Sequence, residues 1–248
     1  MTAPIPRDIP DLPAVPGPPS LLPAPVPATA VVTPVRHPLT AGFRLLAAVL
    51  AIAGVVSALT SGDPLTRTLS HFSTLSALLL AAVLTLSARR AWTARRPLPS
   101  AVTGAALLYV VASCLVHHLV LTNTGSPLPT AGSPTGRPAL THHLLDTAVP
   151  LAAVADWLFL TAPGRLHLRQ ATGWLLLPLA YLTFSVTRGD LLPPDSTALF
   201  LHPSLDSDQH GYKAVLGNTL LTGLACYALA VLLVALDHTR PNPLRRPC

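Results

Sequence analysis

Residues 42–61 read GFRLLAAVLAIAGVVSALTS, and this stretch decides the class of the protein. It contains one charged residue, Arg44, and roughly the 20 residues that an α-helix needs to cross a hydrocarbon core of ~30 Å. A crossing segment must be helical because no water is present there to satisfy the backbone amides. The stretch therefore predicts a membrane-spanning helix.

Five further apolar segments predict an all-α bundle of six transmembrane helices over residues 41–240. They are residues 69–88, 101–121, 142–163, 171–188 and 212–236. The composition agrees, since 10% of the residues are charged and the mean hydropathy is +0.53. A soluble domain normally carries about 25% charged residues, because its surface faces water. We therefore expect the lipid bilayer to be the principal partner of this chain.

The two ends of the chain have a different composition. Residues 1–40 hold 12 of the 28 prolines, and proline favours extended chain over helix. We expect a disordered cytoplasmic tail there, either passive or a ligand for a protein partner, and a short cytoplasmic tail at 241–248. A secretory signal peptide is not expected, because it needs a basic start followed by an unbroken apolar stretch.

The arginines predict the orientation, because Lys and Arg are retained on the cytoplasmic side. With both termini inside, four basic residues flank the outer ends of the segments, namely Arg67, Arg137, Arg188 and Lys213. The other twelve flank the inner ends: Arg7, Arg36, Arg44, Arg89, Arg90, Arg95, Arg96, Arg165, Arg169, Arg240, Arg245 and Arg246. Since these charges lie between apolar runs and form no continuous stripe, nucleic-acid binding is not expected. The abundance of Ala, Leu, Arg and Pro suggests a bacterial source, and hence the bacterial plasma membrane.

Seven of the ten histidines fall at the predicted outer face. They are His71, His117, His118, His142, His143, His202 and His210. Histidine can ligate a metal or act as a base near neutral pH, but it is also simply tolerated at a polar interface. The pattern leaves a functional cluster and an interfacial placement open.

The segment 142–163 holds the best local combination. His142 and Asp146 are four residues apart and so share one helix face, where a carboxylate would orient the imidazole. Asp156 lies about 15 Å deeper, where a carboxylate is costly and usually faces the bundle interior. A structural hydrogen bond, for example to Tyr181, is the plainer interpretation of Asp156.

The segment 69–88 offers hydroxyl groups. It opens with His71-Phe-Ser-Thr-Leu-Ser76, in which Ser73 and Ser76 share a face. A hydroxyl there could serve as a nucleophile if a base reached it, although most intramembrane hydroxyls bond to their own or a neighbouring helix.

A series of short motifs runs through the segments in a fixed order. It comprises His71–Ser76, Ala88-Arg-Arg-Ala-Trp92, Leu108-Tyr-Val-Val111 with His117-His118, Val149-Pro150 to Asp156-Trp157, Pro178-Leu-Ala-Tyr181 to Arg188-Gly189, and Gly211-Tyr-Lys-Ala-Val-Leu-Gly-Asn218. Over residues 42–240 the chain resembles the bacterial six-helix relatives of the androgen-induced transmembrane proteins. Animal members of that family hydrolyse fatty-acid esters of hydroxy fatty acids, and related actinobacterial chains are described as integral membrane regulators.

The resemblance implies a catalytic threonine early in the second helix and a histidine early in the fourth. The threonine position holds Ser73, with Thr74 beside it, and the histidine position holds Asp146. The outer-loop pattern is also altered, to His202-Pro-Ser-Leu-Asp206. Because a carboxylate is a weaker base than imidazole at neutral pH, His142 or His143 would have to supply the base.

Three functions stay open at this point. The first is a membrane regulator or scaffold that has lost the catalytic pair. The second is a lipid-ester hydrolase with Ser73 or Thr74 as nucleophile, His142 as base and Asp146 as its orienter, and with His71, His117, His118, His143, Asp156 and Tyr181 in supporting positions. The third is metal or haem ligation by His117, His118, His142 and His143. The first two involve no cofactor.

Overall fold

The computed structural model describes residues 36–62, 64–121, 137–191 and 207–241, and its regular structure within these ranges is entirely helical. The long helices are α2 (Pro38–Leu59), α4 (Phe72–Trp92), α5 (Ser100–Leu115) and α10 (Ser207–Thr239), with a short α3 (Leu65–Ser70) before α4. The predicted fourth span consists of α6 (Arg137–His143) and α7 (Val149–Ala155), which follow each other in one line and are called the fourth rod below. The helices α8 (Leu168–Trp174) and α9 (Leu176–Leu191) come after it. These helices confirm the predicted all-α class.

Five helices in the described ranges are long and apolar enough to cross a bilayer. They are Pro38–Leu59, Phe72–Trp92, Ser100–Leu119, Ala139–Leu160 and Leu216–Thr239. Large apolar side chains cover their outward faces, such as Leu46, which is 72% exposed, and Leu220, which is 66% exposed. An apolar surface of this extent is unfavourable in water but suits contact with lipid. Five of the six predicted spans are therefore confirmed by length and composition.

The predicted segment 171–188 is not one straight helix. The chain turns at Leu175 between α8 and α9, and α9 has 16 residues. Pro178 explains the break, because it has no N–H and its ring crowds the carbonyl of Trp174, four residues earlier. The Tyr109 hydroxyl of α5 donates to that carbonyl at 2.9 Å. The sixth span stays a prediction.

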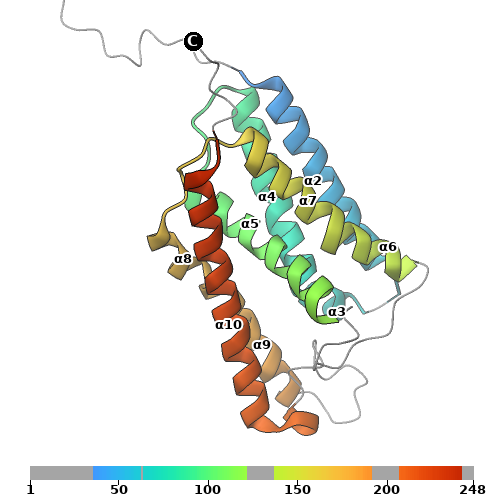
Figure 1. The fold of residues 1–248 in the computed structure, drawn as a ribbon. Coiled ribbons are helices and arrows are strands. Elements are labelled where there is room, and N and C mark those ends of the chain that lie inside the picture. The colour runs from blue at the N-terminus through green and yellow to red at the C-terminus, as the bar shows by residue number, and fades with distance from the viewer. Residues whose placement is uncertain (1–35, 63, 122–136, 192–206, 242–248) are drawn as a thin grey trace, which may run out of the picture. The chain divides into compact units, whose positions relative to one another are not determined.

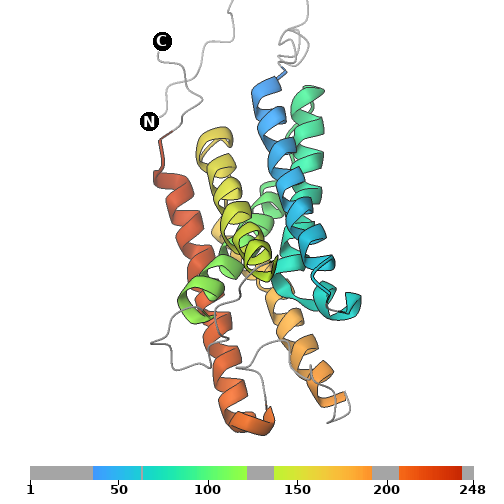
Figure 2. The ribbon, with the colours of Figure 1, turned by 90° about the vertical axis from the view of Figure 1, so that its right-hand side faces the viewer.

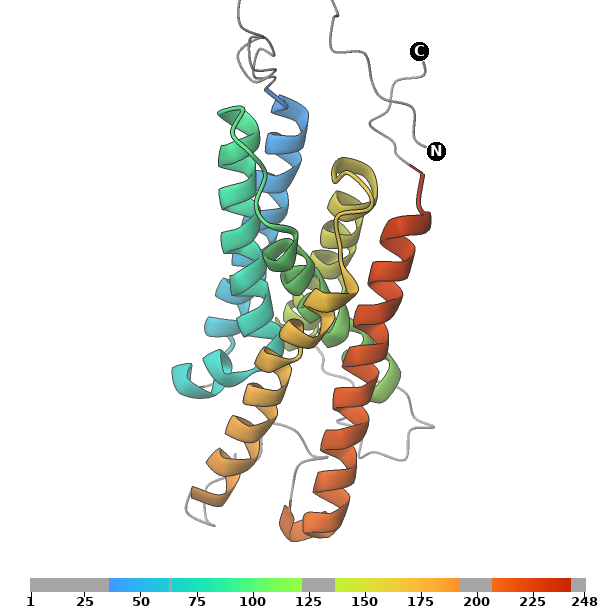
Figure 3. The same ribbon diagram turned by 90° about the vertical axis from the view of Figure 1, so that its left-hand side faces the viewer.

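Small residues bring α2 against α4 and the fourth rod. The buried side of α2 is formed by Ala47, Ala48, Ala51, Gly54, Val55 and Ala58. Without a hydrophobic driving force between helices in lipid, close van der Waals contact of this kind drives their association. Figure 1 shows α2, α4 and the α6–α7 rod running side by side, with α9 and α10 adjacent on the other side. Figures 2 and 3, from the two flanks, show α2 and α4 side by side along their length, whereas α9 and α10 diverge from each other.

The contacts also show which helix ends lie together. The N–H of His37, before α2, donates to the Ala91 carbonyl near the end of α4 at 3.2 Å. At the other end, Ser57 of α2 and Thr141 of α6 share a hydrogen bond of 2.8 Å. The start of α2 and the end of α4 therefore lie at one end of the bundle, and the start of the fourth rod lies at the opposite end.

The predicted tail boundary needs a small correction. Residues 38–40 were expected in the tail but form the first turn of α2. Pro38 has a φ that is already suited to a helix start and lacks only a donor that the first turn does not use. Residues 1–35 and 242–248, and hence most of both predicted tails, lie outside the described residues.

The contact between α5 and α8 depends on Gly104. A Cβ there would lie 2.5 Å from the Trp174 ring and 2.9 Å from Leu166. We expect Gly104→Ala to destabilise the protein by about 1–3 kcal/mol, because the neighbouring ring has to move. Thermal unfolding of the purified protein in detergent measures this.

Gly173→Ala is the matched control, since a Cβ at Gly173 meets nothing within 4 Å. An unfolding temperature for Gly104→Ala that equals that of Gly173→Ala would contradict the predicted contact.

Candidate functional site

Three π-helical segments interrupt the α-helices, and they carry His117 and two of the buried carboxylates, Asp146 and Asp156. They are η1 (Val116–Leu121) after α5, η2 (Leu144–Ala148) between α6 and α7, and η3 (Asp156–Leu160) after α7. In η2 the N–H of Val149 bonds to the carbonyl of Leu144, five residues back. Pro150 comes next and has no N–H to continue the α-helical pattern. Single π turns of this kind occur frequently at functional sites.

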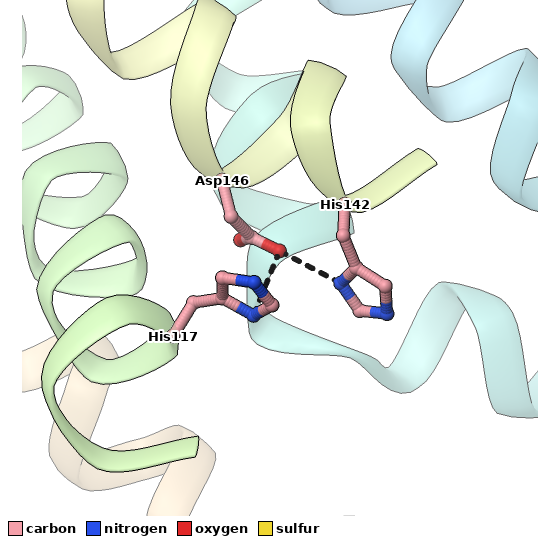
Figure 4. A group of neighbouring side chains, drawn as sticks. All are labelled: His117, His142 and Asp146. Carbon is pink, nitrogen blue, oxygen red and sulfur yellow. Dashed lines mark hydrogen bonds and ion pairs between the residues drawn. The ribbon is translucent and has the colours of Figure 1, made fainter. Parts of the chain in front are cut away.

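Asp146 is the centre of a cluster built from two helices. Its side chain is 5% exposed, and its Oδ2 lies 3.0 Å from Nδ1 of His142 and 3.6 Å from Nδ1 of His117. Figure 4 shows the two imidazoles approaching the same carboxylate oxygen, His117 from η1 and His142 from the end of α6. The predicted His142–Asp146 contact is therefore present, and His117 joins it from another helix.

The surroundings hold these three groups in place. Ser113 of α5 donates to the other carboxylate oxygen, Oδ1, at 3.1 Å, which leaves Oδ2 to the histidines. The His117 and His142 rings are stacked, with centroids 4.9 Å apart and planes 14° apart. Side-chain exposure rises from Asp146 to His117 (14%) to His142 (44%). The cluster is thus most exposed at His142.

The charge of Asp146 has few partners. Among the described residues, only the two histidines come within ion-pair distance of its carboxylate, and no lysine or arginine does. Burial of an unpaired carboxylate is costly. A positive charge held beside the carboxylate would offset this cost.

The spacing of the three nitrogen and oxygen atoms suits a metal ion. One ring nitrogen of each histidine and a carboxylate oxygen of Asp146 all lie within 4.8 Å of one another. For ligand distances of about 2.1 Å, the edge of a tetrahedral site is about 3.4 Å, and the observed distances of 3.0 and 3.6 Å lie on either side of it. Two imidazoles and one carboxylate could hold a transition metal with an open position.

Other predicted residues lie nearby but outside this cluster. Nε2 of His118 contacts the Thr147 hydroxyl at 2.9 Å, and His143 is exposed at the end of α6. Of the four histidines considered as metal or haem ligands, the structure brings two, His117 and His142, together with Asp146. His202 lies outside the described residues.

The predicted hydroxyl nucleophiles are not bonded to this cluster. Thr74 is buried, but neither it nor Ser73 forms a hydrogen bond with His142 or Asp146. Ser76 donates back to the Ser73 carbonyl of its own helix at 3.0 Å, which is the ordinary role of an intramembrane hydroxyl.

An aromatic group lies at the start of α4, where His71 is the residue before the first helical turn. The ring of Phe72 packs against the rings of Tyr181 of α9 and Tyr109 of α5, with centroid distances of 5.1 and 6.1 Å. The hydroxyls of Tyr181 and Ser185 are buried without a hydrogen-bond partner in the described structure. Tyr181 therefore packs beside the predicted nucleophile segment and does not contact the His–Asp cluster.

Asp156 is buried, as predicted, but its partner is Arg44 and not Tyr181. Nε of Arg44 lies 2.7 Å from Asp156 Oδ1, and both side chains are 12% exposed. The Thr161 hydroxyl adds a contact to Arg44 at 3.2 Å. Arg44 was expected only as a charge at the flank of its segment, so this ion pair, which joins α2 to η3, was not predicted.

A third buried carboxylate, Asp237 near the end of α10, was not predicted. It is 1% exposed and accepts hydrogen bonds from the Trp157 indole at 3.1 Å, from the backbone N–H groups of Arg165 and Leu166 at 2.8 and 2.9 Å, and from Arg240 at 2.8 Å. The Arg240 guanidinium also lies over the Trp157 ring at 4.7 Å. The sequence does contain a pattern that could have predicted this ion pair. Arg240 follows Asp237 by three residues, which places the two side chains on one helix face.

Comparison with protein-family models, curated protein sequences and solved structures finds no match to this chain.

Removal of the Asp237 carboxylate tests how much this group stabilises the bundle. Asp237→Ala leaves the nearly buried Arg240 guanidinium and two backbone donors without their acceptor, so we expect a loss of about 3–5 kcal/mol. Thermal unfolding in detergent is the measurement. Thr239→Ala, an exposed residue that bonds only to its own helix, should change stability by less than about 0.5 kcal/mol. Equal stability of the two variants would contradict this role.

Proposed function

We propose that this chain is a multi-pass membrane protein that binds a divalent transition-metal ion at His117, His142 and Asp146. The observation that carries the proposal is the convergence of three ligand atoms from two helices within 4.8 Å. The buried carboxylate, which has no arginine or lysine beside it in the described structure, gives the cation its counter-charge.

The donor set favours particular metals. Imidazole nitrogen suits zinc, iron and similar ions, whereas magnesium and calcium prefer all-oxygen sites. Ser113 supports the carboxylate through its second oxygen, as groups around metal ligands commonly do. Three protein ligands leave a position for water or substrate, which is typical of catalytic zinc sites and atypical of structural ones. A metal bound there would polarise a carbonyl or activate a water molecule.

Metal content tests the proposal directly. The purified protein, loaded with Zn²⁺ and then passed through a desalting column, should retain about one equivalent of the metal. The affinity should fall, and the Kd rise, as the pH is lowered, because the imidazoles must be deprotonated to bind. His117→Ala and Asp146→Asn should each abolish retention. Titration with Co²⁺, followed by its visible absorption, gives a second measurement that does not depend on activity.

His118→Ala and His143→Ala are the matched controls, because both residues lie close to the cluster without belonging to it. They should retain the metal. Retention that is unchanged in Asp146→Asn, or lost equally in His143→Ala, would contradict the proposed ligand set.

A lipid-ester hydrolase is the second candidate, and the His142–Asp146 hydrogen bond of 3.0 Å favours it. An oriented imidazole of this kind can serve as a general base, with Ser73 or Thr74 supplying the hydroxyl. Labelling by a serine-hydrolase probe that disappears in the Ser73→Ala, Thr74→Ala double variant would support it. If the protein shows neither metal retention nor probe labelling, the remaining function is that of a membrane regulator or scaffold. The proline-rich tail would then be available for a protein partner.

The proposal includes six spans, with both termini on the cytoplasmic side of a bacterial plasma membrane. Together α8 and α9 cover residues 168–191, enough for a sixth crossing with a break at Leu175. We expect cysteines introduced at Thr93 and Thr239 to react with a membrane-impermeant maleimide only after the cells are permeabilised. A cysteine at Thr66 should react in intact cells.

The background for this experiment carries alanine at Cys114, Cys226 and Cys248. All three test positions are exposed. Labelling of Thr93→Cys and Thr239→Cys from opposite sides would show an odd number of crossings between them and overturn the six-span topology.

A further inference from the structure

The turn after α4 gathers arginine side chains around a hollow. Ala94 has a φ of 54°, in the left-handed region that usually requires glycine. The N–H of Arg95 donates to the Arg90 carbonyl at 2.9 Å, which is the hydrogen bond of a Schellman C-cap. The turn folds Arg95 back toward the last turns of α4. The hollow that results is lined by Leu86, Arg89, Arg90, Thr93 and Arg95.

Within the described residues, no carboxylate pairs with the positive charges at this hollow. Among the described residues, Arg89, Arg90 and Arg95 form no ion pair with a carboxylate. Arg90 donates only to the Arg96 carbonyl, at 3.5 Å. In contrast, Arg44 and Arg240 are each paired with a buried aspartate. A strained turn that concentrates unpaired charge points to an anionic ligand.

The position of the hollow indicates the kind of anion. It lies at the end of a membrane span, where Leu86 is 51% exposed and Trp92 is 58% exposed. Tryptophan is enriched at the level of the lipid head groups, and the leucine, two turns earlier, faces the acyl chains. A ligand that occupies this hollow therefore has a negative head beside the arginines and an apolar tail beside Leu86.

We propose that this hollow binds the phosphate of an anionic phospholipid. The planar guanidinium forks of Arg89 and Arg95 match phosphate oxygens in a bidentate arrangement, and Arg90 adds a third positive charge. This site is separate from the His–Asp cluster and does not depend on the metal proposal. It would tie the α4–α5 turn to the anionic leaflet of the membrane.

Lipid titration of the full-length purified protein, followed by native mass spectrometry, tests the site. Phosphatidylglycerol should bind more than tenfold tighter than phosphatidylcholine with the same acyl chains. The double variant that carries Arg89→Gln and Arg95→Gln should bind phosphatidylglycerol about thirtyfold more weakly and bind phosphatidylcholine as before. The single Arg95→Gln variant, at an exposed position, should weaken phosphatidylglycerol binding about fivefold and keeps the test valid if the double variant misfolds.

The double variant Arg165→Gln, Arg169→Gln is the matched control. It removes the same charge from two exposed side chains elsewhere, one in the loop before α8 and one in the first turn of α8. It should keep phosphatidylglycerol binding within twofold of the parent protein. Equal weakening in both double variants would show unspecific charge attraction and overturn the site. Displacement of phosphatidylglycerol by millimolar inorganic phosphate would also overturn the proposal, since it would show a site for free anions.

Discussion

A carboxylate buried among membrane helices needs a counter-charge or donors inside the protein, because lipid supplies neither. Asp146, Asp156 and Asp237 are all nearly buried, and each takes its partners from more than one helix or loop. Asp156 joins η3 to α2 through Arg44, and Asp237 joins α10 to η3 and to the loop before α8. The small-residue contacts between helices are non-directional, so these polar links define which helix ends meet.

Asp146 differs from the other two in the nature of its partners. Arginine is always charged and completes a static ion pair, as in the Asp156 and Asp237 networks. Asp146 has histidines, which exchange protons near neutral pH and bind metals, and its cluster is most exposed at His142. The two networks with arginine therefore serve the architecture, and the histidine network is the one suited to chemistry.

Hydropathy predicted most of the fold because span length is a strong constraint of the bilayer. The four-residue spacing of His142 and Asp146 predicted their contact because it is a local property of one helix. His117 and Arg44 come from other helices, and a single sequence holds no signal for which helices meet. The break at Leu175 follows from Pro178, but the hydroxyl of Tyr109 that satisfies the freed carbonyl could be found only in three dimensions. The left-handed Ala94 was likewise hidden, since glycine is the usual marker of such a turn.

The Asp237 network has a consequence for biosynthesis. A polypeptide is made from its N-terminus, so the Trp157 indole and the Arg165 and Leu166 amides enter the membrane region before their acceptor has been synthesised. They find it only when α10 has been inserted. The contacts of Asp237 therefore form only after α10 has been synthesised. An incomplete chain that ends before Asp237 carries unsatisfied polar groups, and such groups are what membrane quality-control proteases could use to recognise it.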